Sequence, residues 1–202
     1  MNVVVVRKIF TKIYKERLWG DNDNPNYSGS SGPGSDTSYN ILTYIPFLKK
    51  FITDNNIKNI VDLGCGDFYF GKHIYEDLDV NYVGIDVYEE MIDYLNNQYP
   101  YSFQSYDFFK FRDELPDADL YIIKDVFQHW DNKSIVQMLD FLIDERNFKY
   151  ILVCNGSNQT EEKDIKIGEY RPLNHTMYPL NKYDFQLVFS WDVKDVLVLK
   201  SD

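Results

Sequence analysis

Hydrophobic and polar positions alternate along the chain in short blocks that predict strands and helices in turn. Seven apolar runs have the length of β-strands, and we place them at 57–63, 80–86, 101–107, 118–125, 149–155, 183–191 and 192–200. Helical spacing of apolar positions predicts helices at 2–19, 37–54, 69–77, 89–98 and 132–143. In the first of these, apolar positions such as Val5 and Ile9 alternate with basic ones.

This order of elements predicts an α/β fold. Strands that alternate with helices form right-handed βαβ units and a parallel sheet, and near-continuous apolar strands are buried on both faces. A tight turn joins the last two strands, which should therefore be antiparallel. We expect a single domain over 1–202, with N-terminal helices and a loop in 1–56 and the α/β core in 57–202.

Residues 20–35 consist almost entirely of turn-forming residues and predict no regular element. One interpretation is a disordered linker. The other is a lid or ligand-binding loop, because a long Gly/Ser loop inside a single domain often has that role. Asp36, which follows the loop, is a candidate N-cap for the next helix.

Composition narrows the classes of partner. The chain has 202 residues and a net charge of −11, and such a field repels phosphate backbones, so we expect no nucleic-acid partner. Its apolar runs are too short to cross a bilayer, and the start lacks the features of a signal peptide, so we expect no membrane insertion and a cytoplasmic location. Cys65 and Cys154 are expected to be free thiols.

The strongest local motif is Val61-Asp62-Leu63-Gly64-Cys65-Gly66-Asp67, where a strand ends and a helix begins. Glycines at 64 and 66 allow a tight turn and a close approach of the backbone to a ligand. A G-x-G pair by itself is also found in dinucleotide-binding folds and in plain turns. Here Tyr69 replaces the third glycine of the dinucleotide-binding motif G-x-G-x-x-G. The acidic residue at 67 disfavours a pyrophosphate. A cationic sulfonium is compatible with both of these residues.

Acidic residues also end the next two predicted strands. Asp86 lies 20 residues beyond Gly66, where a carboxylate accepts hydrogen bonds from ribose hydroxyls. Asp107 and Phe108 offer a carboxylate and a flat ring that suit an adenine. Each Asp taken singly is a common turn residue, but three carboxylates at three successive strand ends favour a ligand site.

VDLGCGD and YVGIDV resemble the first two motifs of class I S-adenosylmethionine-dependent methyltransferases, over about 58–155 and the terminal hairpin. The resemblance implies S-adenosylmethionine as cofactor and a Rossmann-like seven-stranded sheet in the order 3-2-1-4-5-7-6 with strand 7 antiparallel. The cofactor-binding residues it implies are Asp62, Gly64, Cys65, Gly66, Asp86, Val87, Asp107, Phe108 and Lys124.

A narrower resemblance rests on Trp19-Gly20, SGSSGPGS, KDVFQHW at 124–130 and GEYRPLN at 168–174. These segments are similar to a methyltransferase subfamily with a W-G…SGxGS start, a [KR]-D-x-x-x-H segment and a late RPLN. Some of its members are linked to glycan synthesis, including methylation of deoxysugars, which implies a sugar or glycan acceptor. Relatives often read APCGD where this chain reads LGCGD, a change that should leave cofactor binding intact.

The acceptor side is expected beyond the fourth strand, at Asp125 and His129. A hydroxyl must lose its proton to attack a methyl group, so we interpret His129 as general base, with Asp125 orienting it or binding the acceptor. The alternative is that His129 caps the next helix or packs beside Trp130. The candidate substrate-binding residues are Tyr27, Ser31, Trp130 and Arg171.

The sequence indicates no convincing metal site, although Asp107, Asp125 and His129 would form one if they converged. The favoured function is therefore an O-methyltransferase acting on a sugar or glycan hydroxyl. Two alternatives stay open: an N- or O-methyltransferase of a small metabolite or protein, and a non-catalytic module that binds S-adenosylmethionine. Neither the sugar nor the oligomeric state follows from the sequence.

Overall fold

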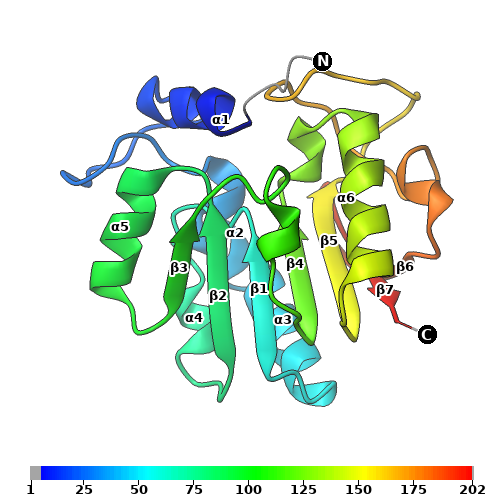
Figure 1. Cartoon of the computed structure of the whole chain (residues 1–202), viewed down its shortest axis with the longest axis horizontal. Coiled ribbons are helices and arrows are strands. Elements are labelled where there is room, and N and C mark those ends of the chain that lie inside the picture. Colours follow the sequence, from blue (N-terminus) through cyan, green and yellow to red (C-terminus); the bar gives the residue numbers. More distant parts are fainter. Residues whose placement is uncertain (1–5, 202) are drawn as a thin grey trace.

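The computed structural model describes residues 6–201, and its seven strands form one mixed sheet in the order β3-β2-β1-β4-β5-β7-β6 (Figure 1). This is the order that the resemblance implied. The strands are β1 (Asn59–Leu63), β2 (Asn81–Asp86), β3 (Ser102–Ser105), β4 (Leu120–Lys124), β5 (Tyr150–Gly156), β6 (Gln186–Trp191) and β7 (Lys194–Lys200).

Strand direction also matches the expectation. The first five strands pair in parallel, whereas β7 is antiparallel to both β5 and β6. The β5–β7 ladder runs from the pair Tyr150 and Lys200 to the pair Gly156 and Lys194. It therefore brings the start of β7 to the carboxyl end of β5, where the site lies.

The helices are α1 (Val6–Lys15), α2 (Thr37–Asn40), α3 (Tyr44–Asp54), α4 (Lys72–Tyr75), α5 (Glu89–Gln98) and α6 (Asn132–Glu145). The helix predicted at 37–54 is divided at Thr43, whose backbone is not helical, and the one predicted at 69–77 shortens to a single turn. Of the helix predicted at 2–19, residues 2–5 lie outside the described part. Within residues 6–201, no helix is both long and apolar enough to cross a membrane.

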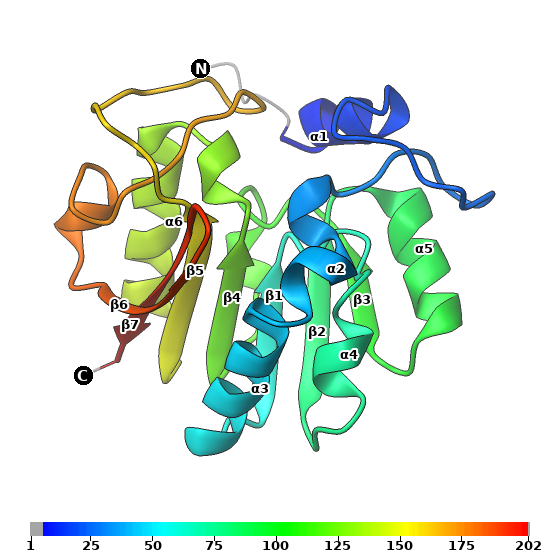
Figure 2. The ribbon, with the colours of Figure 1, turned by 180° about the vertical axis from the view of Figure 1, so that it is seen from behind.

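Both faces of the sheet are covered, as the continuous apolar strands predicted. Helix α6 lies on one face, and α3 and α4 lie on the other (Figures 1 and 2). Successive residues of β4 point to opposite faces, so Ile123 packs in one core cluster with Met138 of α6 and Ile122 in the other with Leu48 of α3. Because both faces are covered, β4 carries no charged side chain before Lys124 at its end.

Helix α1 lies across the carboxyl edge of the parallel strands (Figure 1). It buries Val6, Phe10, Ile13 and Tyr14 and so closes the edge on one side. From its end the chain returns through residues 20–35, whose only regular piece is the single turn Pro33–Ser35. Asp36 then caps α2 as predicted, accepting a hydrogen bond from the Ser38 amide at 2.7 Å.

Candidate active site

A pocket at the carboxyl edge of the sheet, named here the edge pocket, collects most of the residues singled out in the sequence. Of these residues it is lined by Ser31, Asp62, Gly64, Cys65, Gly66, Asp86, Val87, Phe108, Lys124, Asp125, His129 and Trp130. Other lining residues, among them Phe10, Tyr14, Trp19 and Tyr44, were not among the predicted site residues. They come from the N-terminal helices and the segment after α1, where helical periodicity revealed buried faces but gave no indication of a ligand.

The turn between β1 and α4 requires its two glycines. Gly64 and Gly66 have backbone φ angles of 81° and 58°, which residues other than glycine rarely adopt. A Cβ on Gly64 would collide with Val126, and one on Gly66 would collide with the Ser31 hydroxyl. The backbone of this turn is therefore closely enclosed by its neighbours in the edge pocket.

Asp86, the last residue of β2, is oriented by backbone amides. Its Oδ1 accepts hydrogen bonds from the amides of Val87 at 2.7 Å and Tyr88 at 3.2 Å, and its Oδ2 accepts one from Gly66 at 3.1 Å. Burial raises the pKa of Asp86 to about 6, and these backbone bonds oppose the rise. Oδ2 still has a lone pair available, so the carboxylate can receive a ligand hydroxyl.

The edge pocket favours a cation over an anion. Asp67 and Asp86 are buried around the glycine turn and Asp62 is partly buried there, while the charge of Lys124 lowers the pKa of Asp62. Burial raises the pKa of Asp62 to about 7, although Tyr82 donates a hydrogen bond to it at 2.8 Å. A ligand with a positive charge would stabilise the ionised forms of these carboxylates.

Two buried polar atoms of the edge pocket have no hydrogen-bond partner within residues 6–201: the indole nitrogen of Trp130 and the hydroxyl of Tyr44. Such atoms cost about 1–3 kcal/mol each when they stay unpaired, so a polar ligand would stabilise this pocket. Trp130 also stacks on Phe108, with ring centroids 5.6 Å apart, and presents flat apolar surface. Carboxylates, unpaired donors and flat rings together fit S-adenosylmethionine, which combines a sulfonium, a ribose and an adenine.

The loop of residues 20–35 packs against the glycine turn. Ser31 Oγ accepts a hydrogen bond from the Asp67 amide at 2.8 Å and shares another with the Tyr14 hydroxyl at 2.9 Å. Further along, the carbonyl of Gly34 accepts a hydrogen bond from Lys124 at 2.7 Å. Through Ser31 and Gly34 the loop thus makes defined contacts with residues that line the edge pocket.

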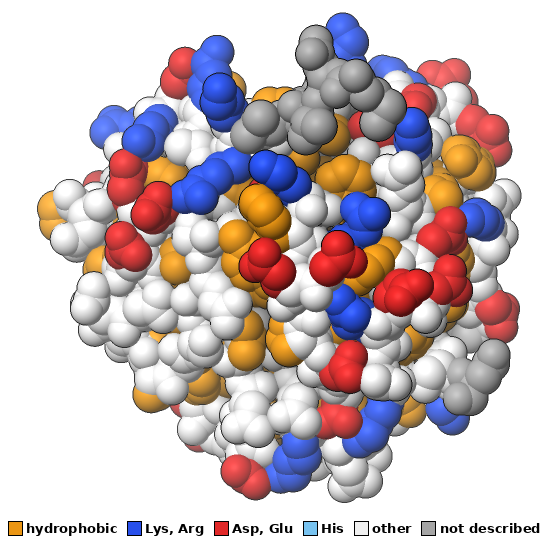
Figure 3. Space-filling view, in the orientation of Figure 1, with side chains coloured by type: hydrophobic (Ala, Val, Ile, Leu, Met, Phe, Trp, Pro, Cys, Tyr) orange, Lys and Arg blue, Asp and Glu red, His pale blue; other side chains and the backbone are white. Residues whose placement is uncertain are grey.

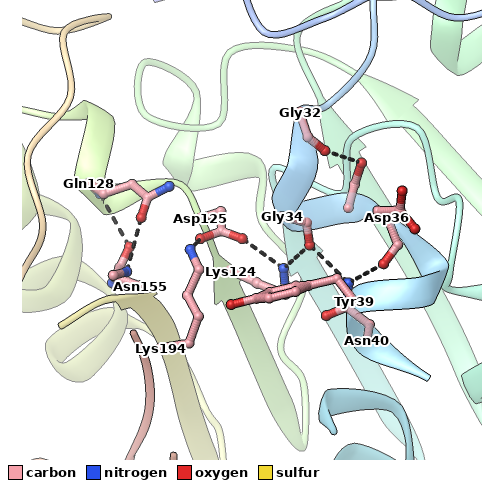
Figure 4. Close-up of polar contacts among 12 residues, drawn as sticks. Gly32, Gly34, Asp36, Tyr39, Asn40, Lys124, Asp125, Gln128, Asn155 and Lys194 are labelled. Atoms are coloured by element: carbon pink, nitrogen blue, oxygen red, sulfur yellow. Dashed lines mark hydrogen bonds and ion pairs between the residues drawn. The ribbon is translucent and has the colours of Figure 1, made fainter. Parts of the chain in front are cut away.

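Asp125 lies between two ammonium groups (Figure 4). Lys124 contacts Oδ2 at 2.7 Å, and Lys194 from the start of β7 contacts Oδ1. Burial alone would raise the pKa of Asp125, but the two lysines outweigh it and hold the pKa at about 2. A carboxylate this acidic is a poor base, and both of its oxygens are bound to lysines rather than to His129. The interpretation that Asp125 orients His129 is therefore not supported by its contacts.

His129 ends the short turn Phe127–His129 after β4 and has a defined tautomer. Its Nδ1 lies 3.0 Å from the carbonyl oxygen of Glu169, which can only accept, so Nδ1 carries the proton. Nε2 is then an acceptor, 3.5 Å from the side-chain amide nitrogen of Gln128. Burial lowers the pKa of His129 below its usual 6.5, which keeps the ring neutral at pH 7. A neutral imidazole whose unprotonated Nε2 makes one long contact, to Gln128, is suited to accept a proton.

The glutamine beside His129 is itself fixed. Its Oε1 accepts a hydrogen bond from the Gly156 backbone amide at 3.1 Å, and its backbone N–H donates to Oδ1 of Asn155 at 3.2 Å (Figure 4). The amino end of Gln128 is therefore the end that faces His129. This agrees with an unprotonated Nε2.

Three predicted site residues lie outside the edge pocket. Tyr27 packs against Tyr88 and Tyr94, with ring centroids 6.3 and 5.4 Å away. Asp107 caps the turn that follows it, accepting from the Lys110 amide at 3.1 Å. Arg171 is buried, and its guanidinium is occupied by protein oxygens, so its placement does not support the predicted contact with substrate.

The residues considered for a metal site do not converge. Asp125 is occupied by lysines, and Asp107 caps a turn at the end of β3. Across residues 6–201, no group of three or more His, Cys, Asp or Glu side chains is arranged to hold a metal ion.

Basic residues of α1 near the edge pocket are paired with acidic residues of α5. Arg7 contacts Glu89 and Lys15 contacts Glu90, each at 2.7 Å. On the face drawn in Figure 3, acidic and basic side chains are interspersed. The positive charges of α1 are thus partly neutralised and leave less attraction for a polyanion.

A family model described as a methyltransferase domain matches residues 60–144, from β1 to α6. No curated protein matches the chain by sequence. The matched segment contains the glycine turn, Asp86 and His129, which are the parts of the edge pocket that the α/β core supplies.

Solved structures share the fold. Magnesium protoporphyrin IX methyltransferase from Synechocystis PCC 6803, with bound S-adenosylmethionine, aligns over 100% of both chains with 13% identity and a TM-score of 0.63. The human N-acetylserotonin methyltransferase, also in complex with that cofactor, aligns with 78% of this chain, at 19% identity and a TM-score of 0.58. The mitomycin 7-O-methyltransferase MmcR aligns with 73% of it, at 16% identity and a TM-score of 0.56.

The alignments cover 55% of the human chain and 50% of MmcR, so this chain spans about half the length of those two proteins. At such identities the likeness establishes the shared fold. The acceptor must therefore be argued from the chain's own residues.

Proposed function

We propose that this chain is an S-adenosylmethionine-dependent methyltransferase that transfers the methyl group to a hydroxyl of a sugar or glycan, with His129 as general base. The observation that supports this most is the tautomer of His129. Its Nδ1 donates to the Glu169 carbonyl at 3.0 Å, which leaves Nε2 unprotonated and able to take a proton. His129 shares the edge pocket with Asp86 and the glycine turn, so the base and the cofactor-binding residues lie around one cavity.

The chain's own groups suit the parts of the cofactor. Asp86 would accept hydrogen bonds from the ribose hydroxyls, and the stacked rings of Phe108 and Trp130 would pack on the adenine. The buried carboxylates near the glycine turn would stabilise the cationic end. When bound, S-adenosylmethionine supplies a methyl group on a sulfonium, so the protein has no leaving group to activate.

The remaining chemical task is to deprotonate the acceptor, and His129 is placed for it. Nε2 of His129 would take the hydroxyl proton while the acceptor oxygen gains the methyl group and the methyl–sulfur bond breaks, with the electron pair of that bond left on sulfur. The imidazolium formed keeps its hydrogen bond from Nδ1 to Glu169, so the ring need not turn during the step. A lowered pKa lets the ring return the proton to water at neutral pH.

Aromatic rings around His129 favour a sugar among hydroxyl acceptors. The ring centroid of Trp19 lies 4.9 Å from that of His129, and the half-exposed Tyr170 lies 5.7 Å from it. Flat rings of this kind pack on the C–H faces of sugars while polar groups bind the hydroxyls. The same segments carry the resemblance to methyltransferases linked to glycan synthesis.

The test is methyl transfer from labelled S-adenosylmethionine to a panel of nucleoside-diphosphate sugars and oligosaccharides. We expect a methylated sugar, with the label lost when His129 is replaced by Ala. A parallel panel of amines and peptides examines the nitrogen alternative, and label in that panel alone would contradict the proposal. Calorimetric binding of S-adenosylmethionine without transfer to either panel would instead support a non-catalytic module.

A further inference from the structure

Arg171 is buried within the loop between β5 and β6 although it carries a permanent charge. Only 3% of its surface is exposed. Its guanidinium donates to the carbonyl of Lys163 at 3.0 Å, to the carbonyl of Phe127 at 3.1 Å and to the side chain of Asn132 at 2.6 Å. The planar fork of arginine directs donors from three different nitrogens to these acceptors, whereas the donors of a lysine all lie on one nitrogen.

The three acceptors lie on both sides of His129. Phe127 begins the turn that His129 ends, and Asn132 is the first residue of α6 beyond it. Lys163 belongs to the loop that faces this turn. The guanidinium therefore joins the loop to the chain before and after His129.

The loop and the turn also meet through backbone hydrogen bonds. The amide of Arg171 donates to the Gln128 carbonyl at 3.0 Å, and the amide of Gly168 donates to the His129 carbonyl at 2.9 Å. Between these two contacts lies Glu169, whose carbonyl accepts from Nδ1 of the His129 ring. The position of that carbonyl thus depends on how firmly the loop is fixed to the turn.

We propose that Arg171 is a positioning residue, which fixes the loop of residues 163–171 against the Phe127–His129 turn and thereby holds His129 with its proton on Nδ1. The catalytic consequence rests on the proposed function, whereas the tautomer itself does not. The nitrogen that carries the proton in a neutral imidazole is set by the hydrogen bond of the ring. If the Glu169 carbonyl moves away, Nδ1 loses its acceptor and the ring is free to turn or exchange tautomer.

The direct test is nitrogen-15 NMR of the imidazole rings in the full chain, at a pH where they are neutral. The chain has only three histidines, so the His129 signals can be assigned with a His129→Gln variant. In the unmodified protein we expect the proton on Nδ1. In Arg171→Met we expect a mixture of tautomers or the proton on Nε2. An unchanged Nδ1–H signal would overturn the proposal.

Arg146 provides a matched control. It also donates to backbone carbonyls, those of Glu145, Arg112 and Asp113, and none of these residues lines the edge pocket. Arg146→Met removes a comparable set of bonds and should leave the His129 signals unchanged. A tautomer change in this control as large as that in Arg171→Met would indicate general loosening and overturn the specific role of Arg171.

Two further variants separate charge from geometry and guard against misfolding. Arg171→Lys keeps the charge but loses the fork, so we expect the tautomer to stay mixed, and full recovery of the Nδ1–H signal would contradict positioning by the fork. Asn132→Ala leaves Arg171 in place and removes its 2.6 Å contact. If Arg171→Met does not fold, Asn132→Ala takes its place, and we expect its His129 signals to show mixed tautomers or the proton on Nε2. Unchanged His129 signals in Asn132→Ala would count against the proposal.

Activity then distinguishes this inference from the proposed function. With an acceptor from the sugar panel, Arg171→Met should lower kcat about 10²-fold, because small displacements of a catalytic group have effects of that size, while the Kd of S-adenosylmethionine stays within about twofold. A tautomer change without any sugar methylation by the unmodified protein would sustain the positioning role and remove the sugar hypothesis. Sugar methylation by the unmodified protein, with an unchanged tautomer in Arg171→Met, would sustain the sugar hypothesis and remove the positioning role.

Discussion

Ser31 and Asp67 bind each other through two hydrogen bonds of opposite direction. The Asp67 amide donates to Ser31 Oγ at 2.8 Å, and the Ser31 amide donates to Asp67 Oδ2 at 2.9 Å. One partner belongs to the loop of residues 20–35 and the other to the glycine turn of the edge pocket. A movement of the glycine turn would therefore also act on the loop, as the lid interpretation of residues 20–35 requires.

Ser31→Ala tests this link. The change removes the hydroxyl bonds to the Asp67 amide and Tyr14, each worth about 0.5–1.5 kcal/mol, but keeps the backbone bond. We expect faster hydrogen exchange at 20–35 without ligand, slowing on addition of S-adenosylmethionine, and a severalfold weaker affinity by calorimetry. Ser28→Ala is the control, because the Ser28 side chain makes none of the hydrogen bonds found within residues 6–201. Equal exchange in Ser31→Ala and the unmodified protein would favour a loop that is independent of the pocket.

Asp86→Asn tests the ribose site. The amide cannot accept from the Gly66 backbone through its nitrogen, and it lacks the charge that strengthens bonds to hydroxyls. We expect the Kd of S-adenosylmethionine to rise at least tenfold, measured by calorimetry. Asp107→Asn is the matched control, because Asp107 caps a turn outside the edge pocket and Asn keeps a capping oxygen. If Asp107→Asn weakens binding as much, the adenine does contact Asp107, as the sequence suggested.

The same carboxylate should make stability depend on pH. Burial raises the pKa of Asp86 to about 6 in the folded chain, above the value of about 3.9 in an unfolded one. The folded state therefore binds this proton more tightly, and the stability it contributes is complete below about pH 4 and is lost as the pH rises through 6. We expect the free energy of unfolding, relative to Asp86→Asn, to fall between pH 4 and 7 in urea titrations. A difference that is constant over this range would contradict the raised pKa.

The sequence predicted the sheet well because its central strands are mostly buried on both faces, whereas the outer strands β3 and β6 are largely exposed. The apolar runs that became β1, β2, β4 and β5 carried that signal directly, and the tight turn at Asp192 made the hairpin antiparallel. The N-terminal helices were harder to predict. The break at Thr43 lies three residues before Pro46, whose nitrogen has no proton to donate to the Leu42 carbonyl, and the prediction of one helix over 37–54 did not use this signal.

Some residues of the candidate site could be predicted from the sequence and others could not. Gly64, Asp86 and His129 follow strand ends, so parallel topology alone brings them to one edge. Lys194 could not be found from sequence, since its approach to Asp125 depends on the register that pairs it with Gly156. Arg171 appeared to be a loop residue open to ligand, but long-range packing buries it, and composition does not reveal such packing.

Asp125→Asn should act mainly on stability. The substitution leaves Lys124 and Lys194 buried beside a neutral side chain, and breaking a buried ion pair costs about 3–5 kcal/mol. We expect a loss of that order in denaturant titrations. The double variant Asp125→Asn with Lys194→Met should recover part of it, because one unpaired charge is removed. A loss of activity with unchanged stability would instead show that Asp125 acts in the reaction.

His129→Ala tests the base directly. General-base catalysis contributes about 10²–10⁴-fold, so kcat should fall by that factor while the affinity for S-adenosylmethionine stays near normal. The rate of the unmodified protein should rise with pH and level off above a pKa lower than the usual 6.5, because burial disfavours the protonated ring. Measurement of initial rates from pH 4.5 to 8 with one sugar acceptor checks both points. His73→Ala is the control, because the His73 side chain lies on α4 and does not line the edge pocket. A pH profile that is unchanged in His129→Ala would assign the proton to another group, and a substantial residual kcat would indicate an acceptor that is already ionised.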